Sequence, residues 1–134
     1  MPSNIINNGL FIGERLSLTT SDVVCCPPPL FHCFGLVAGF LAAFIHGAAI
    51  VFPSQDFNPV AVVDALVKEK CTVLHGVPTM FSAILHHLNS TGLELKSLTT
   101  GIIAGSKVPP ALLVELQNKL CYRGFEITYG IFQS

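Results

Sequence analysis

The sequence is poor in charged residues. Asp, Glu, Lys and Arg make up 11% of its 134 residues, whereas they make up about a quarter of an average globular protein. No such residue lies between Asp22 and Asp56. Lys and Arg form no run and the net charge is −1, so the basic surface of a nucleic-acid-binding protein is missing. We therefore expect a largely buried chain with no nucleic-acid partner.

The cysteines and histidines lack the spacings of metal sites and disulfide frameworks. The five Cys are odd in number, no two of them form a Cys-x-x-Cys pair, and the five His show no ligand spacing either. We expect reduced thiols that pack as small hydrophobic side chains, and no metal site. The residues concerned are Cys25, Cys26, Cys33, Cys71, Cys121, His32, His46, His75, His86 and His87.

Targeting and membrane signals are also missing. The N-terminal sequence has no basic region followed by an apolar core, so it predicts no secretory signal. Residues 31–52 are apolar enough to suggest a membrane span, but Gly47 is a typical helix stop and a β-branched run follows it. No Lys or Arg flanks the segment to orient it. We expect no membrane span and a cytoplasmic location, with the peroxisome left open.

What the sequence does have is an alternation of strand-like and helix-like segments. Short apolar runs end at Gly or Pro and are followed by helical patterns, about five times in succession. This order predicts one α/β domain over residues 1–134, with a parallel sheet of about five strands and crossover helices. The expected strands are residues 23–26, 48–52, 71–76, 98–104 and 125–129, and residues 89–94 are expected to form a loop.

Site candidates lie after the strands, because parallel sheets bind ligands beyond the carboxyl ends of their strands. His32 follows three prolines and precedes an apolar helix, so it is either a polar contact at a pocket mouth or a helix-start His bonded to backbone. His75 lies inside a strand and is best interpreted as a buried His with its hydrogen bonds satisfied. Gly105 and Ser106 precede a helix start and offer backbone N–H groups to an anion. No phosphate-loop, Gly-x-Gly-x-x-Gly or Gly-x-Ser-x-Gly motif is present.

Four segments resemble one family, the adenylate-forming acyl-CoA synthetases and ligases. Residues 29–35, Pro-Leu-Phe-His-Cys-Phe-Gly, are similar to the family's Pro-Leu-Phe-His-x-x-Gly segment. Residues 76–80 resemble its Val-Pro-Thr segment, residues 101–106 resemble the strand and turn before the adenine site, and residues 127–130 resemble the start of its Tyr-Gly-x-Thr-Glu signature. The order is the family's, and the similarity is strongest to medium-chain, fungal-type members.

The resemblance implies a two-step reaction in which a carboxylate and ATP give an acyl-adenylate, which CoA then attacks. It implies ATP with Mg²⁺ and CoA as cofactors, and an acyl or aromatic carboxylate as partner. His32 would lie near the reacting carboxylate as the catalytic candidate. The implied acyl pocket comprises Phe31, His32, Phe34, Val77, Pro78, Thr79 and Met80. The implied nucleotide-binding residues are Ala104, Gly105, Ser106, Tyr129 and Gly130.

The departures from the family concern its phosphate-binding groups. The family's phosphate loop would precede residue 1, and Phe132 and Gln133 stand where its Thr and Glu would follow. The later Asp, Arg and catalytic Lys are absent as well. Because charge stabilisation on phosphate is the main catalytic contribution, we expect a truncated adenylation domain that forms no acyl-adenylate alone. The alternatives are a ligand-binding or dimerisation module with an exposed apolar surface, and a new catalytic role for His32.

Overall fold

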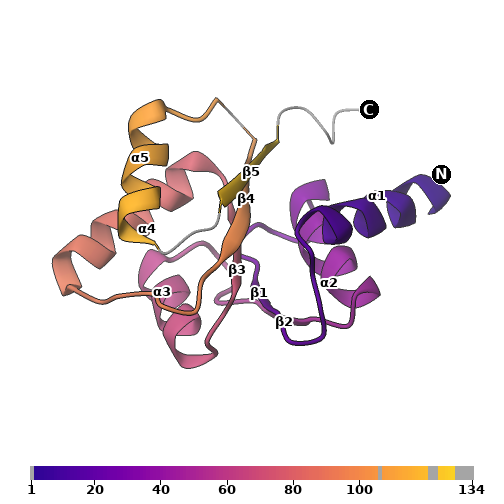
Figure 1. Ribbon diagram of the computed structural model, residues 1–134, viewed down its shortest axis with the longest axis horizontal. Helices are drawn as coiled ribbons and strands as arrows, with labels where there is room; N and C mark the ends of the chain where they lie inside the picture. The colour runs from indigo at the N-terminus through magenta and orange to yellow at the C-terminus, as the bar shows by residue number, and fades with distance from the viewer. Residues whose placement is uncertain (1, 106, 121–123, 129–134) are drawn as a thin grey trace.

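The computed structural model describes residues 2–105, 107–120 and 124–128. They form a five-stranded parallel sheet with helices on both faces (Figure 1). The strand order is β2-β1-β3-β4-β5, and every neighbouring pair is parallel. The strands are β1 (Val23–Cys25), β2 (Ala49–Val51), β3 (Val73–Gly76), β4 (Thr100–Ala104) and β5 (Gly124–Thr128). The predicted α/β class and parallel sheet are therefore confirmed.

Three helices cover one face of the sheet, namely α3 (Pro59–Lys68), α4 (Pro78–Thr91) and α5 (Pro110–Lys119). Each begins with a proline, whose fixed φ suits the first helical position. The side chain of Asn58 caps α3 by accepting the N–H groups of Val60 and Ala61 at 3.0 and 3.3 Å. The local sequence thus sets where these helices begin.

One prediction, concerning where α4 ends, was wrong. Residues 89–91 were expected in a loop but continue the helix, which ends at Gly92 with a φ of 71°. The hydroxyls of Ser90 and Thr91 donate to the carbonyl of His87 at 2.8 and 3.1 Å. These side chains therefore bond back to the last turn, and only the glycine supplies the left-handed residue that stops the helix.

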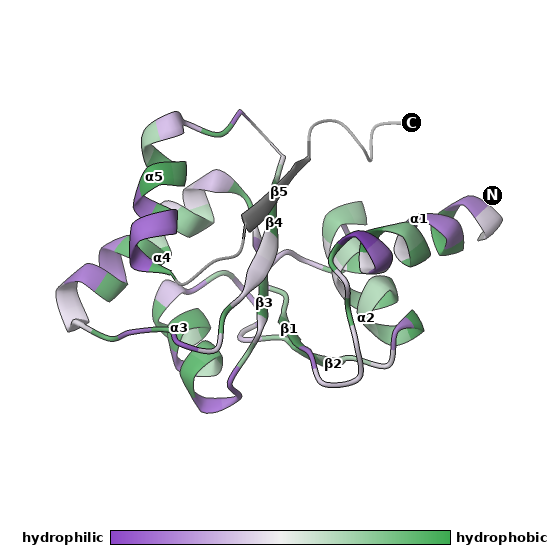
Figure 2. Cartoon of the chain, viewed as in Figure 1, coloured by the Kyte–Doolittle hydropathy of each residue, from purple (hydrophilic) through white to green (hydrophobic). Residues whose placement is uncertain are grey.

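The opposite face carries α1 (Pro2–Arg15), the π-helix η1 (Phe34–Leu41) and α2 (Ala42–Ile45). α1 packs closely on this pair, because a methyl group added at Gly9 would lie 3.1 Å from Leu41 Cβ. The apolar helix expected after His32 is present over residues 34–45, but its first eight residues are π-wound rather than α-wound. Hydrophobic residues run along η1 and α2 in Figure 2, whereas hydrophilic residues recur on α4 and α5.

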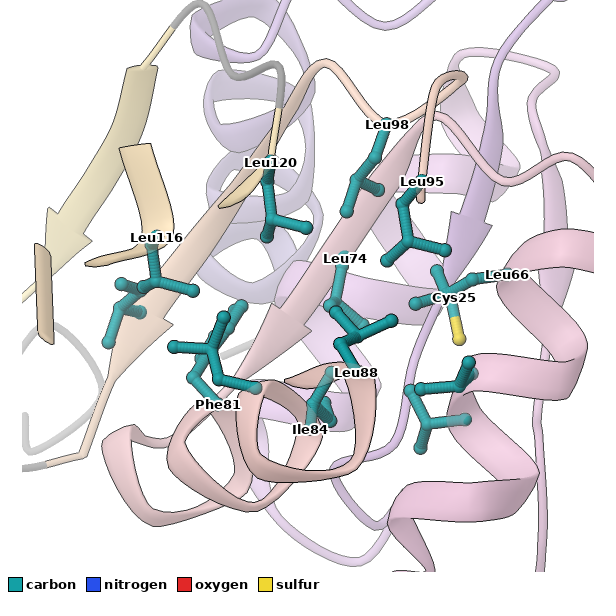
Figure 3. Packing of buried hydrophobic residues seen from close by; sticks show 14 of the residues in the cluster. Cys25, Leu66, Leu74, Phe81, Ile84, Leu88, Leu95, Leu98, Leu116 and Leu120 are labelled. Atoms are coloured by element: carbon teal, nitrogen blue, oxygen red, sulfur yellow. The ribbon is translucent and has the colours of Figure 1, made fainter. Parts of the chain in front are cut away.

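The hydrophobic core has two parts, one on each face of the sheet. Figure 3 shows the part under α4 and α5, where Phe81, Ile84 and Leu88 face Leu74 of β3. The strands also approach each other closely, since a methyl group at Gly101 of β4 would overlap the Leu74 carbonyl. Across the described residues, no helix combines the length and hydropathy needed to cross a bilayer.

Candidate functional site

The candidate site lies where β1, β3 and β4 end. These strands are neighbours in the sheet and run parallel, so the segments after them leave from the same edge. Gly105 follows β4 with a φ of 98°, and a methyl group there would lie 3.0 Å from Val77 Cγ1. The turn after β4 therefore contacts the turn after β3, and only a residue tolerant of the left-handed region fits it without strain.

The turn after β1 is held against the start of η1. The Cys26 thiol lies 3.7 Å from the carbonyl oxygen of Pro28 and 3.8 Å from that of Gly35, as a buried donor. Burial raises the pKa of Cys26 to about 12, so it stays a neutral thiol. A side chain at Gly35 would overlap the Pro29 carbonyl. The glycine in the Pro-Leu-Phe-His-x-x-Gly segment is thus required by this close approach.

His32 is exposed and caps the start of this helical segment. Its Nδ1 accepts the N–H of Phe34 at 3.1 Å, and its own N–H donates to the Pro29 carbonyl at 3.2 Å. Of the two interpretations of His32, the structure shows the backbone contact of a helix-start His, and the contact at a pocket mouth stays a prediction. Because Nδ1 is the acceptor, the proton of the neutral ring lies on Nε2. The ring thus offers solvent an N–H donor rather than a basic lone pair.

The residues expected to line an acyl pocket differ widely in their exposure to solvent. Phe31 is 94% exposed, and His32 and Thr79 are also exposed. Phe34 is only 2% exposed and packs on His75, with ring centroids 5.9 Å apart. Pro78 is buried, while Val77 and Met80 are half-buried. Only part of this set can meet a ligand without rearrangement.

The residues expected at the nucleotide are only partly described. Ala104 is buried at the end of β4, and Gly105 is exposed in the following turn. Ser106, Tyr129 and Gly130 lie outside the described residues. Their assignment to the adenine site stays a prediction.

His75 departs from its expected environment. It is fully buried, as predicted, and its Nδ1 accepts the Ile102 N–H at 3.3 Å. Its Nε2, however, has no hydrogen-bond partner, so the expectation of full satisfaction is wrong. Burial lowers the pKa of His75 to about 4. A single His in an apolar strand was the only signal of this feature in the sequence.

The described cysteines carry free thiols. Cys25, Cys26 and Cys71 are buried and pack as hydrophobic side chains, as expected, whereas Cys33 is exposed, contrary to that expectation. In the part of the chain that the structure describes, no three His, Cys, Asp or Glu side chains come together as a metal site would require. Cys121 lies outside the described residues.

Comparison with known proteins identifies relatives of the chain. Residues 3–131 match the family described as "AMP-binding enzyme". The acyl-CoA ligase sidI of Aspergillus fumigatus is 50% identical over 131 residues, which are 98% of this chain and 22% of the relative. The mitochondrial medium-chain acyl-CoA ligase ACSF2 of Mus musculus is 37% identical, over 95% of this chain and 21% of its own. The chain thus spans about a fifth of the length of these curated relatives.

Solved structures share the fold at lower identity. A long-chain-fatty-acid-CoA ligase, FadD1 of Archaeoglobus fulgidus, superposes with a TM-score of 0.77 at 22% identity, covering 96% of this chain and 27% of that one. ATP-bound MatB of Rhodopseudomonas palustris gives a TM-score of 0.79 at 23% identity, covering 95% and 24%. At these identities the likeness concerns the fold.

Proposed function

This chain belongs to the AMP-binding enzyme family, and we propose that it binds an acyl or aromatic carboxylate at the edge where β1, β3 and β4 end, without forming an acyl-adenylate by itself. The relatives' names support this choice of ligand, because the similar proteins are acyl-CoA ligases. Since the chain spans about a fifth of their length, their complete reaction needs groups that the described residues do not supply.

The observation that carries the proposal is the convergence of three of the family-like segments. The segment with His32 follows β1, the segment with Val77 follows β3, and Gly105 follows β4. Gly105 and Val77 are in contact range at this edge of the sheet. The segments with Val77 and Gly105, which are far apart in the sequence, therefore approach each other at the edge where parallel sheets place their ligands, and the segment with His32 leaves the neighbouring strand at the same edge.

In the proposed site, His32 binds the carboxylate through Nε2–H. The hydrogen bond between Nδ1 and the Phe34 N–H fixes the tautomer that makes Nε2 a donor. Exposed Phe31 lies next to it in sequence and offers apolar surface to the chain or ring of the acid. A role for His32 as a general base is less suited to this geometry, because it would require the helix-capping bond to break.

The residues present do not fit Mg²⁺ with ATP. Magnesium is bound through carboxylates and phosphate, and the described residues that directly follow β1, β3 and β4 include no Asp or Glu. Asp22 directly precedes β1, at the opposite end of the strand from the proposed site. Its carboxylate accepts a hydrogen bond from the Thr72 hydroxyl at 2.8 Å. We therefore propose that the chain binds the carboxylate alone, without ATP, Mg²⁺ or CoA.

The test is ligand-observed NMR with octanoate and benzoate on the whole chain. We expect saturation transfer to both acids from the wild type and a loss of at least tenfold in affinity in His32→Asn. The Asn oxygen still accepts the Phe34 N–H but provides no donor at the Nε2 position. His86→Asn, at an exposed position of α4, is the matched control and should bind as the wild type does.

Three outcomes would contradict the proposal. Equal binding by the wild type and His32→Asn would remove His32 from the site, and no binding of either acid would remove the site itself. Pyrophosphate release from ATP with either acid would show that the chain does form an adenylate. That result would restore the complete first reaction and refute the limited role proposed here.

A second candidate function is self-association through an exposed apolar surface. Ile6 and Phe11 of α1 are 54% and 62% exposed, and Phe44 of α2 is 71% exposed. Phe44 stacks on Phe40 at 5.9 Å between ring centroids. Exposed aromatic residues on two helices that pack together are typical of an interaction surface. Sedimentation velocity should give a dimer for the wild type and a monomer for Phe44→Ser, and a concentration-independent monomer for the wild type would exclude this role.

A further inference from the structure

The proline turn that leads to His32 has no backbone donors of its own. Pro27, Pro28 and Pro29 follow Cys26, the residue after β1, and proline has no backbone N–H. The turn can therefore accept hydrogen bonds but cannot donate them, and its carbonyls depend on donors from neighbouring residues. The His32 N–H is one such donor and bonds to the Pro29 carbonyl at 3.2 Å. The Cys26 thiol is another.

The Cys26 thiol joins the two ends of the segment that carries His32. This segment, residues 28–35, is called the His32 loop below. The sulfur lies 3.7 Å from the carbonyl oxygen of Pro28, where the loop begins, and 3.8 Å from that of Gly35, where it ends. Both contacts are hydrogen bonds from a thiol, which is a weak donor. One S–H group is thus shared between the two ends of the loop.

Packing keeps the sulfur at this position. Cys26 is only 2% exposed, and a methyl group added at Gly39 would overlap its sulfur. The backbone of η1 therefore lies directly against the thiol. Burial also raises the pKa of Cys26 to about 12, so the sulfur keeps its proton at neutral pH and remains a donor.

The orientation of the His32 ring depends on backbone groups close to Gly35. Its Nδ1 accepts the N–H of Phe34 at 3.1 Å, one residue before Gly35. Its carbonyl accepts the N–H of Leu36 at 3.0 Å, one residue after Gly35. The thiol holds Gly35 against Pro28. If Gly35 moved away from Pro28, the Phe34 N–H would leave Nδ1, and the ring would no longer be restricted to the tautomer with its proton on Nε2.

We propose that Cys26 is a positioning residue for His32, because its thiol holds the ends of the His32 loop together and so keeps the ring as an Nε2–H donor. The consequence for carboxylate affinity rests on the proposed function, whereas the consequence for the tautomer does not. Cys25 offers a matched control, since it is also buried but belongs to the core on the opposite face of the sheet (Figure 3).

The test is nitrogen NMR of the imidazole rings at a pH where they are neutral, because the chemical shifts show which ring nitrogen carries the proton. The His32 signals are those missing from His32→Asn. We expect the Nε2–H tautomer in the wild type. Cys26→Ala should give both tautomers and bind octanoate about fivefold more weakly, as the loss of one hydrogen bond would. Cys26→Ser keeps a donor and should retain the wild-type tautomer and affinity. Cys25→Ala should behave as the wild type.

Retained amide signals of β3 and β4 show that each variant is folded. If Cys26→Ala does not fold, Cys26→Val replaces it, since it fills the space of the sulfur but also lacks a donor. The proposal is overturned if the donor-free variant keeps the wild-type tautomer, or if Cys26→Ser or Cys25→Ala shows the same mixture as Cys26→Ala. A failure of octanoate to bind the wild type would refute the carboxylate site, while the tautomers would still decide the role of Cys26.

Discussion

Acidification should destabilise this protein through His75 in a defined pH range. Burial lowers the pKa of this side chain from its ordinary 6.5 to about 4. The unfolded chain therefore takes up a proton at a pH where the folded chain does not, so acid favours unfolding. The contribution of the neutral ring is fully present above pH 6.5 and is lost as the pH falls from 6.5 to 4. At 1.36 kcal/mol per pH unit, the loss is about 3 kcal/mol.

The assay is urea unfolding at several pH values between 7 and 4, for the wild type and for His75→Leu. Other titrating groups contribute to both proteins, so the difference between their free energies of unfolding isolates His75. We expect the wild type to lose about 3 kcal/mol more than His75→Leu over this range. Because Leu fills most of the volume but makes no hydrogen bond, the variant should be less sensitive to acid even if it is less stable at pH 7.

A control at another histidine makes the result specific. His86→Asn, exposed on α4, should keep the pH dependence of the wild type. If His75→Leu does not fold at pH 7, His75→Asn replaces it, since it also cannot titrate. The same pH dependence in the wild type and in the position-75 variant would refute the reasoning. It would mean that the folded chain accommodates the protonated ring at no cost.

Three further predictions concern packing, capping and thiol access. Gly101→Ala should destabilise the fold by about 3 kcal/mol in thermal or urea unfolding, because the added methyl group overlaps the Leu74 carbonyl; an unchanged midpoint would contradict the close approach of β3 and β4. Asn58→Ala should cost about 1 kcal/mol by removing the cap of α3, whereas Asn58→Ser should cost much less. Iodoacetamide should label Cys33 in the native protein and Cys26 only after unfolding, as peptide mapping would show. Labelling of Cys26 in the native protein would contradict its burial under the proline turn.

The fold was largely predictable because local signals agree with one another. Apolar strand runs end at Gly or Pro, and the pair Asn58 and Pro59 is a strong helix-start signal, which the structure confirms. The order of the strands in the sheet was not predictable in this way. β1 lies between β2 and β3, whereas the alternation of strands and helices along the chain does not specify which strands pair. The end of α4 was missed because Ser90 and Thr91 are common in loops, while their backbone contacts form only in the helix.

The site was predictable in its segments but not in its geometry. The segment around His32 stands out by its residues, yet whether the ring accepts or donates depends on the Phe34 N–H. The π winding leaves no signal, because a helix that is apolar on all sides shows no period that distinguishes π from α. The missing partner of His75 depends on the relative placement of a strand and a helix, which is set by tertiary packing rather than by local sequence.

The pairing of β1 with β3 has a consequence for synthesis of the chain on the ribosome. The Val23 N–H donates to the Thr72 hydroxyl, 49 residues later, and β1 and β3 pair directly beyond this point. At translation rates of about 5–20 residues per second, β1 would wait about 3–10 seconds for β3, the second of its two neighbours, to be made. During that interval an apolar, uncharged segment has emerged with only part of its sheet. Nascent chains of this protein should therefore depend strongly on chaperones, and synonymous changes that slow translation between β2 and β3 should lower the soluble yield.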